Sequence, residues 1–380
     1  MTPVTVVGAG FAGCEAAWTL AQNGIPVTLW EMKPQKFSPA HHSPDFAELI
    51  CSNSFKASRL ESAAGLLKAE MERLGSLCVP CAKETAVAAG GALAVDRDGF
   101  SALVTEKIRS HPFITVREGE VTEIPDGNVI IATGPLTSEA LSAAIGELIS
   151  AEYLSFFDAA APIVEASSID MDKVFFAARY GRGDDDYINC PFDKEGYENF
   201  AKELANAESV ELKEFEKRDF KIYEGCMPIE VMARRGADTM RFGPLKPVGL
   251  RDPKTGHRPW AAVQLRRENE AGTLYNIVGF QTNLKFPEQK RVFSMIPGLE
   301  HAVFARYGVM HRNTFMNSPK LLHADFSLRS DPRIFFAGQM TGVEGYMESA
   351  SSGLIAGIAM ARRLRGLPRS SCPKPPCSAR

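Results

Sequence analysis

The sequence predicts an α/β protein in which a parallel-sheet domain, formed by both ends of the chain, is interrupted by a second α/β domain. Three observations predict this class. A strand, a glycine-rich turn and a helix occupy residues 4–24, a second strand–glycine–helix unit occupies residues 333–364, and the region between has no second phosphate-binding turn. We therefore assign residues 1–150 and 305–365 to the first domain, residues 151–304 to an inserted domain, and residues 366–380 to a disordered tail.

The first unit has the order of parts that a dinucleotide requires. Val4–Val7 reads as a strand, residues 13–23 as a helix and residues 25–30 as a second strand. In the turn, Gly8 permits the bend, Gly10 lets backbone N–H groups approach a pyrophosphate, and Gly13 lets the helix pack closely on the strand. Glu31 follows at the spacing of a carboxylate that binds a ribose hydroxyl. The predicted dinucleotide contacts here are Gly8, Ala9, Gly10, Phe11, Ala12, Gly13 and Glu31.

The second unit indicates which dinucleotide is bound. Residues 129–135 and 333–339 read as buried strands ending in small residues, and a small-residue helix covers residues 354–364. Such a unit near a C-terminus commonly completes a flavin site, so we predict a Rossmann-type FAD-binding domain with an inserted α/β domain. Tyr346 falls in the glycine-rich turn before the helix, where it either packs or stacks beside the flavin. The further predicted FAD contacts are Thr133, Gly134, Gly338, Gln339, Gly342, Tyr346 and Ser351.

The remaining elements are predicted from periodicity and caps. In the first domain we expect a helix over residues 60–74, a helix capped by Asp98 and running to Arg109, a strand over residues 115–121 and a helix from Ser138. In the inserted domain, strand-like residues 173–180 and 274–281 alternate with acidic helices over residues 195–207 and 210–215.

Composition excludes several classes of protein. The formal net charge is −3, and no apolar run reaches the ~18–20 residues of a membrane span. The first strand begins almost at residue 1, which leaves no room for a signal peptide, so we expect a cytoplasmic protein. Its eight cysteines are then expected to be free rather than paired. The histidines show no metal-ligand spacing, and we predict no metal.

The inserted domain divides by charge. Residues 151–230 carry about twice as many acidic as basic side chains, whereas residues 231–312 carry more than twice as many basic as acidic ones. One interpretation is a solvated face; the other is a surface that binds a phosphate backbone. On the second interpretation the predicted RNA contacts are Arg234, Arg235, Arg241, Arg266, Arg267 and Lys285.

Two cysteines have a context that suits chemistry. Cys226 precedes Pro228, which is typical of the first turn of a helix, so its thiol is expected near a helix N-terminus. Cys51 borders a polar Ser-Asn-Ser turn in the long loop after the first βαβ unit, where this class of fold places its active site. The lone CxxC of Cys78 and Cys81 is weak evidence for zinc or for a redox pair.

Together these segments resemble one family. The motifs that carry the resemblance are residues 8–17, 31–34, 49–54, 90–97, 132–138, 224–230, 240–250 and 338–349. They resemble the folate- and FAD-dependent tRNA (uracil-5-)-methyltransferases, the TrmFO family, over residues 1 to about 365. More distantly, the chain is similar to the FAD proteins that modify the tRNA wobble uridine.

The resemblance implies an activity and its reactants. A one-carbon unit would pass from methylenetetrahydrofolate by way of reduced FAD to C5 of a uridine in the tRNA T-loop, with NAD(P)H as reductant. The family's functional cysteines match Cys51 and Cys226. We assign the thiolate that adds to C6 of the uracil to Cys226 and a supporting acid–base or nucleophilic role to Cys51, while the reverse assignment stays open. The implied partner is tRNA, with no stable protein partner.

Three other hypotheses remain at this point. The same chemistry could act on ribosomal RNA. An NAD(P)H–FAD disulfide reductase would use Cys78 and Cys81 as its redox pair. The resemblance also implies a further ordered segment where this chain has its Pro-, Ser- and Cys-rich tail, so the third hypothesis is an inactive, truncated flavoprotein that binds RNA. The preference between NADH and NADPH and the oligomeric state stay open.

Overall fold

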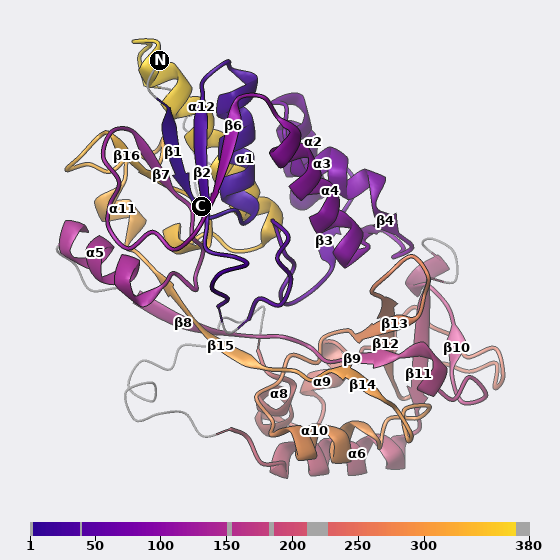
Figure 1. Cartoon of the computed structure of the whole chain (residues 1–380). Helices are drawn as coiled ribbons and strands as arrows, with labels where there is room; N and C mark the ends of the chain where they lie inside the picture. The colour runs from indigo at the N-terminus through magenta and orange to yellow at the C-terminus, as the bar shows by residue number, and fades with distance from the viewer. Residues whose placement is uncertain (1–2, 39, 150–153, 182–185, 211–226, 370–380) are drawn as a thin grey trace, which may run out of the picture.

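A computed structural model describes residues 3–38, 40–149, 154–181, 186–210 and 227–369. Its centre is a five-stranded sheet in the order β16-β7-β1-β2-β6, with every neighbouring pair parallel (Figure 1). These strands are β1 Val4–Val7, β2 Val27–Glu31, β6 Ile114–Glu118, β7 Val129–Ile131 and β16 Ile334–Phe336. A strand from near the C-terminus thus completes the N-terminal sheet, and the predicted fold class is confirmed.

Two helices pack against each other beside this sheet. They are α1 Phe11–Gln22 and α12 Tyr346–Leu364, which run side by side in indigo and yellow in Figure 1. Glycine is required at the contact, because a Cβ on Gly353 would lie 2.0 Å from the Ala12 carbonyl oxygen. Helix α12 begins eight residues earlier than predicted. The small residues before Leu354, which were expected to precede the helix, belong to it and let α12 approach α1 closely.

The other elements of this region cover the sheet and its loops. The helices are α2 Ala63–Arg73, α3 Cys78–Glu84, α4 Arg97–Ser110, α5 Glu139–Ile149 and α11 Ser318–Leu321, and a small sheet joins β3 Ser54–Ala57, β4 Ala86–Val87 and β5 Ala92–Val95. The predicted cap of α4 was wrong by two residues: the side chain of Asp96, not Asp98, accepts the N–H of Gly99. Asp98 lies in the first turn instead.

The inserted region is built on a different, antiparallel sheet. Its strand order is β10-β11-β12-β13-β9-β14. The bounds are β9 Ile163–Glu165, β10 Phe175–Phe176, β11 Tyr187–Phe192, β12 Ala261–Arg267, β13 Leu274–Ile277 and β14 Phe304–Arg306. The helices are α6 Lys194–Asn206, α8 Ile229–Arg235, α9 Thr239–Phe242 and α10 Phe286–Phe293, with 3-10 turns η1 Ala166–Ser168 and η2 Arg179–Gly181. A second hydrophobic core lies among these elements.

Two predicted strands of the inserted region are shorter in the structure than the sequence suggests. The strand expected over residues 173–180 was too long, because the chain turns through η2 directly after β10. The strand expected over residues 274–281 ends at Ile277. Nearly all of the helix expected over residues 210–215 lies outside the described residues.

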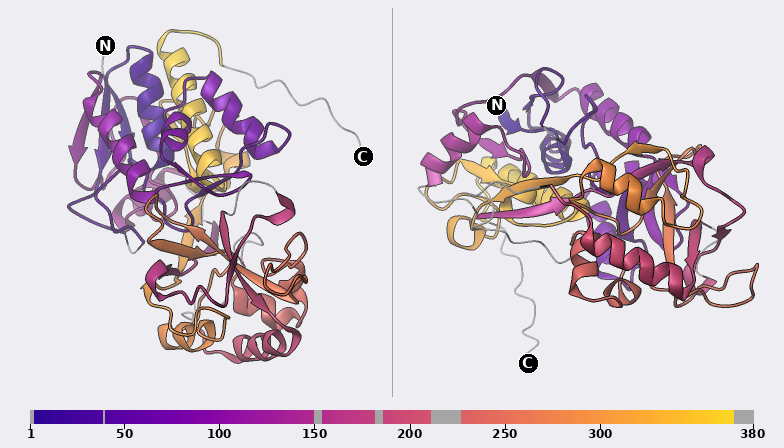
Figure 2. Two further views of the ribbon diagram at one scale, coloured as in Figure 1. Left: turned by 90° about the vertical axis from the view of Figure 1, so that its right-hand side faces the viewer. Right: turned by 90° about the horizontal axis from the view of Figure 1, so that it is seen from below.

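A two-stranded antiparallel ribbon connects the two regions. It pairs β8 Leu154–Ala159 with β15 Met310–Phe315, and it crosses between them in each view of Figure 2. The predicted boundaries near residues 151 and 304 fall close to these strands and stay a prediction. No helix among the described residues is long and apolar enough to cross a membrane.

Candidate active site

A cavity of about 560 Å³ lies at the carboxyl ends of the parallel strands. Residues that follow β1, β2, β7 and β16 form most of its wall, and Arg266 and Gln281 of the inserted region complete it. The edge where parallel strands end is the usual ligand site of such sheets. The predicted FAD contacts that line the cavity are Gly8, Ala9, Gly10, Phe11, Ala12, Glu31, Thr133, Gly134, Gly338, Gln339 and Tyr346.

Three predicted FAD contacts are not part of the cavity lining. A Cβ on Gly13 would lie 1.7 Å from the Gly8 carbonyl oxygen, so Gly13 serves the close packing of α1 on the turn. Gly342 ends the 3-10 turn η4 Gln339–Thr341 with φ +86°. The Ser351 hydroxyl donates back to the Glu348 carbonyl at 2.8 Å, whereas Ser349 lines the cavity instead. Ser349 was not predicted because the helix was expected to begin only at Leu354. In the structure Ser349 and Ser351 are both helical, and their positions around the helix decide which of them lines the cavity.

The glycine turn fits a dinucleotide diphosphate. Gly10 is the N-cap of α1 and provides no side-chain acceptor for the first N–H groups of the helix, which leaves these donors for an anion. Nothing lies within 4 Å of the place where a Cβ of Gly10 would be. Glu31 braces the turn, since its carboxylate accepts the N–H groups of Ala9 at 2.7 Å and Lys33 at 3.0 Å. The arrangement of donors and open backbone therefore suits FAD.

Cys51 enters the same cavity from the loop after β2. This cysteine is half-buried and lines the cavity. The hydroxyl oxygen of Tyr346 accepts the backbone N–H groups of Ile50 and Cys51, both at 2.9 Å, and of Ser52 at 3.4 Å, and it lies 3.2 Å from the Cys51 sulfur. The ring of Tyr346 stacks on Phe11, with 4.8 Å between ring centroids. Tyr346 thus connects the FAD turn to the cysteine loop.

The direction of the contact between oxygen and sulfur follows from counting donors and acceptors. A tyrosine hydroxyl has one proton and two lone pairs. Because backbone N–H groups, two at 2.9 Å and a third at 3.4 Å, already occupy the lone pairs of the Tyr346 oxygen, its proton is the part that remains for the sulfur. Burial, with a further contribution from Cys51, raises the pKa of Tyr346 well above its ordinary value, so the hydroxyl keeps that proton at neutral pH. A donor directed at sulfur favours the thiolate, the nucleophilic form.

Arginines hold the cysteine loop from the other side. Arg97 donates to the Leu49 carbonyl and forms an ion pair at 2.8 Å with Glu268, whose side chain is buried, while that of Arg97 is 14% exposed. Arg266 is 7% exposed and donates to Ser52 Oγ at 2.8 Å and Asn53 Oδ1 at 2.9 Å. Burial lowers the pKa of Arg266, and Glu268 opposes that shift. Arg97 is the last residue of the motif at residues 90–97, but nothing in the sequence indicates that it pairs with Glu268.

The predicted RNA contacts lie in different settings. Arg266 is in the cavity wall, and the backbone carbonyl of Arg267 accepts the amide of Asn53. The other cations are engaged by protein groups, as the structure records for Arg234 with the Ala205 and Ala207 carbonyls, Arg241 with Asp238 and the Trp260 ring, and Lys285 with Glu208. Arg235 is exposed. Cys226, the second predicted catalytic residue, lies outside the described residues.

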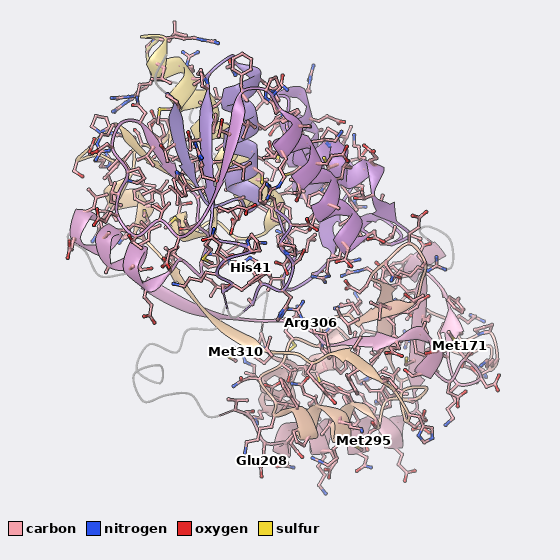
Figure 3. The ribbon with its side chains drawn as sticks, in the orientation of Figure 1. His41, Met171, Glu208, Met295, Arg306 and Met310 are labelled. Carbon is pink, nitrogen blue, oxygen red and sulfur yellow. The ribbon has the colours of Figure 1, made fainter. Side chains whose placement is uncertain are left out.

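His41 and Arg306 are further polar residues near the cysteine loop that sequence reasoning left without a role. His41 lines the cavity. Arg306, the last residue of β14, is directed from the inserted region toward the first region in Figure 3, where His41 is also labelled. Burial and the neighbouring Arg97 lower the pKa of Arg306. Of the cationic side chains, Arg97 of the first region and Arg266 of the inserted region contact the loop that holds Cys51.

The CxxC pair occupies a different environment. Cys78 and Cys81 lie in α3 and are fully buried in the hydrophobic core. Burial raises the pKa of Cys78 well above its ordinary value and that of Cys81 to about 12. Glu15 accepts the N–H groups of Leu77 and Cys78 and so holds the start of α3. Among the described residues, no group of three or more His, Cys, Asp or Glu side chains is arranged to hold a metal ion.

Comparisons with known proteins connect this site to a family. A model of the family described as Glucose inhibited division protein A matches residues 3–368. Among solved structures, Aquifex aeolicus GidA has a TM-score of 0.73 at 16% identity, covering 97% of this chain and 64% of that chain, which supports the fold.

Two curated relatives are much more similar in sequence. The methylenetetrahydrofolate–tRNA-(uracil-5-)-methyltransferase TrmFO of Acetivibrio thermocellus is 61% identical over 372 residues, covering 98% of this chain and 85% of the relative. The protein of the same name from Enterococcus faecalis is 60% identical over 363 residues, covering 96% of this chain and 83% of the relative. The resemblance seen in the motifs is confirmed, and the chain belongs to the TrmFO family and to the wider family described as Glucose inhibited division protein A.

Proposed function

We propose that the chain is a methylenetetrahydrofolate- and FAD-dependent tRNA (uracil-5-)-methyltransferase. Relatives with this name are about 60% identical to it over nearly its whole length. The single structural observation that carries the proposal is the meeting of a dinucleotide turn and a half-buried cysteine in one cavity. FAD chemistry and thiol chemistry can therefore act on the same base.

The residues of the turn would hold FAD. The N–H groups at the start of α1, which no side chain caps, would bind the diphosphate, and Glu31 would be the carboxylate for the ribose. The backbone around Thr133–Gly134 and Gly338–Gln339 forms the remaining wall. When bound, FAD supplies the transfer of the one-carbon unit and the redox chemistry between methylenetetrahydrofolate and the uracil.

The two cysteines would divide the chemistry on the base. A thiolate that adds to C6 of a uracil makes C5 nucleophilic, and a second group must later remove the proton from C5. We assign the addition to Cys226 and a supporting acid–base or nucleophilic role to Cys51. The support for Cys51 is its position in the cavity and the Tyr346 hydroxyl 3.2 Å from its sulfur. The support for Cys226 is its sequence context before Pro228, the N-cap of α8.

The finer points of the proposal concern the target and the reductant. We infer that the methylated position is a uridine of the T-loop, that NAD(P)H reduces the flavin, and that the protein acts in the cytoplasm on free tRNA. The folate- and FAD-dependent chemistry of the family supports the reductant, and the basic composition of residues 231–312 supports an RNA partner. That no stable protein partner is needed stays a prediction.

The test is direct methyl transfer. Purified FAD-loaded protein is mixed with an unmodified tRNA transcript, methylenetetrahydrofolate labelled in its one-carbon unit and NADH or NADPH, and nucleosides are analysed for labelled 5-methyluridine. We expect label in full-length tRNA, loss of label when the T-loop uridine is replaced by cytidine, and none with Cys226→Ala. A ribosomal RNA fragment as alternative acceptor is the matched control. Label in that fragment but not in tRNA would refute the tRNA assignment.

The disulfide reductase hypothesis finds no support in the described residues. It needs an accessible thiol pair, and both Cys78 and Cys81 are fully buried with raised pKa values. No observation favours it over methyl transfer.

A further inference from the structure

The inserted region displays an aromatic side chain that its own core does not use. Phe242, the last residue of α9, is 83% exposed, more than any other large hydrophobic side chain recorded among the described residues. Tyr180, in η2, is 56% exposed and has φ +60°, a backbone conformation that is uncommon outside glycine. Isolated exposed apolar residues are ordinary, so the surroundings of these two rings decide whether they have a role.

The backbone that carries Phe242 is firmly anchored. Met240 and Leu245, on either side of it, are fully buried in the core of the inserted region, and the Leu245 N–H donates to the Met240 carbonyl at 2.9 Å. Pro244 packs so closely on Gly279 that a Cβ there would lie 2.4 Å from the proline. The ring of Phe242 is therefore held outward by a rigid turn.

The segment 242–250 contacts Tyr180, and hydrogen bonds of Arg179 connect it to strand β12. The Tyr180 N–H donates to the Gly249 carbonyl at 2.9 Å, and a Cβ on Gly249 would meet the tyrosine ring at 2.9 Å. Arg179 donates to the Lys246 and Val248 carbonyls and to Gln264 Oε1. Gln264 is two residues from Arg266 on β12, so both side chains leave the same face of the sheet about 7 Å apart. Arg179 thus connects the segment to β12, the strand whose Arg266 lines the cavity.

Cations predominate along the segment, and the exposed Asp238 just before it pairs with Arg241 at 2.7 Å. Residues 243–258 include four exposed cations, Lys246, Arg251, Lys254 and Arg258, and their one acidic residue, Asp252, is buried. Arg251 donates to the Gly256 carbonyl and Lys254 to the Met171 and Asp172 carbonyls, and none of the four cations forms an ion pair with a carboxylate of the described residues. Aromatic rings interleaved with cations next to a positively charged path are the pattern that binds unpaired nucleotides.

We propose that segment 242–250 and Tyr180 form the surface that receives unpaired bases of the tRNA beside the target uridine. Phe242 stacks on a base, Tyr180 provides a second ring, and Lys246 contacts a phosphate. This inference rests on the proposed function, because it takes tRNA as the substrate. It gives a role to the motif of residues 240–250, which neither the cavity nor the cysteine loop uses.

Direct binding of tRNA to the FAD-loaded enzyme tests the inference. Phe242→Ala and Phe242→Leu are expected to weaken the equilibrium affinity for unmodified tRNA about fivefold to a hundredfold, the range of one lost base–aromatic stack. Phe242→Trp should stay within about twofold of wild type. Lys246→Ala should lower the slope of affinity against salt concentration by about one ion. The absorbance spectrum of bound FAD should be unchanged in every variant, since the ring of Phe242 lies outside the core.

Phe113→Ala is the matched control. Phe113 is 43% exposed and immediately precedes β6, whereas the cavity lies at the other end of that strand, lined by Gly119 and Glu120. This variant should bind tRNA as wild type does. Full affinity in Phe242→Leu would show that a ring is not needed and would overturn stacking. Unchanged tRNA affinity in Phe242→Ala, with or without a change in sedimentation of the protein, would overturn the RNA surface; with such a change, it would assign Phe242 to contact between copies of the chain.

The outcome is separable from that of the proposed function. A wild-type protein that binds tRNA but incorporates no labelled methyl group contradicts the methyltransferase assignment, while the binding variants still report on Phe242. A wild-type protein that methylates tRNA, combined with a Phe242→Ala variant of unchanged KM for tRNA, contradicts this inference alone.

Discussion

The Cys51 loop and the Cys78–Cys81 turn of α3 place the same residue type in opposite environments. Cys51 is half-buried at the cavity, 3.2 Å from the Tyr346 hydroxyl and on a loop held by Arg97 and Arg266. The α3 pair is fully buried, and its neighbours are apolar side chains and the carboxylate of Glu15.

The difference teaches that environment, not spacing, decides which thiol is reactive. A thiol in an apolar core beside a carboxylate resists ionisation, because burial and negative charge both disfavour the thiolate. A thiol that faces a cavity, with a hydroxyl donor and arginines nearby, meets neither obstacle. The CxxC spacing drew attention to the pair in the sequence, yet its surroundings make it part of the core.

The largest expected effect separates the two segments by activity. Cys51→Ala should lower single-turnover methyl transfer about a thousandfold or more, the scale for loss of a group that acts on the reacting atoms. Cys78→Ala is the matched control and should transfer methyl groups within about twofold of wild type once it is folded and FAD-loaded. Labelled 5-methyluridine in the tRNA is the measurement. A folded, inactive Cys78→Ala protein would reverse the comparison.

Tyr346→Phe sharpens the same contrast. The variant keeps the ring that stacks on Phe11 but removes the donor to the Cys51 sulfur and the acceptor for three backbone N–H groups. We expect methyl transfer to fall about 10- to 100-fold, in the range of general acid–base and orienting contributions. Because the thiolate loses a hydrogen bond, the rising limb of the pH–rate profile should move to higher pH. A profile of unchanged shape would show that the hydroxyl only supports the loop.

Substitution by serine should rank the two sites in the opposite order. A serine at the fully buried position 78 would place a hydroxyl in an apolar core, where it loses its hydrogen bonds to water. Cys78→Ser should therefore lower the free energy of unfolding by about 1–3 kcal/mol. The same change at the half-buried Cys51 should cost less than about 1 kcal/mol. Urea denaturation of the FAD-free proteins measures both. Equal losses would mean that the two thiols do not differ in burial as the structure describes.

The smallest expected effect is a pH dependence at Glu15. Burial raises the pKa of this carboxyl, against the opposing hydrogen bonds from Ser76 and Cys78. A raised pKa in the folded state means that the contribution to stability is fully present below the unfolded pKa of about 4.3 and is lost as pH rises through the folded value. The free energy of unfolding of wild type minus that of Glu15→Gln should therefore fall as pH rises from about 4. A difference that rises with pH would contradict the direction of the shift.

The sequence pattern was sufficient to predict those elements that depend mainly on residues close together in the chain. The glycine turn, Glu31 and the first two strands of the parallel sheet were predicted to within two residues, and the starts of the other three strands to within one residue, although each of those three ends three or four residues earlier than predicted. The start of α12 and the cap of α4 were predicted wrongly, because serine and glycine before Leu354 read as a loop and Asp96 and Asp98 are equally good caps. At both places the structure has a contact distant in sequence, namely Ala12 against Gly353 and the Glu270 N–H donated to Asp96.

By itself, the sequence determined that a strand–glycine–helix unit binds a dinucleotide, that a second unit completes its sheet, and that Cys51 belongs to a polar loop. The tertiary structure alone decided that Tyr346 reaches Cys51 across 295 residues, that Arg266 belongs to the cavity wall, and that Cys78 and Cys81 are core. The physical reason is the distance along the chain over which each interaction acts. Turn and strand preferences depend on neighbours in the chain, whereas burial and hydrogen-bond partners depend on groups that only folding brings together.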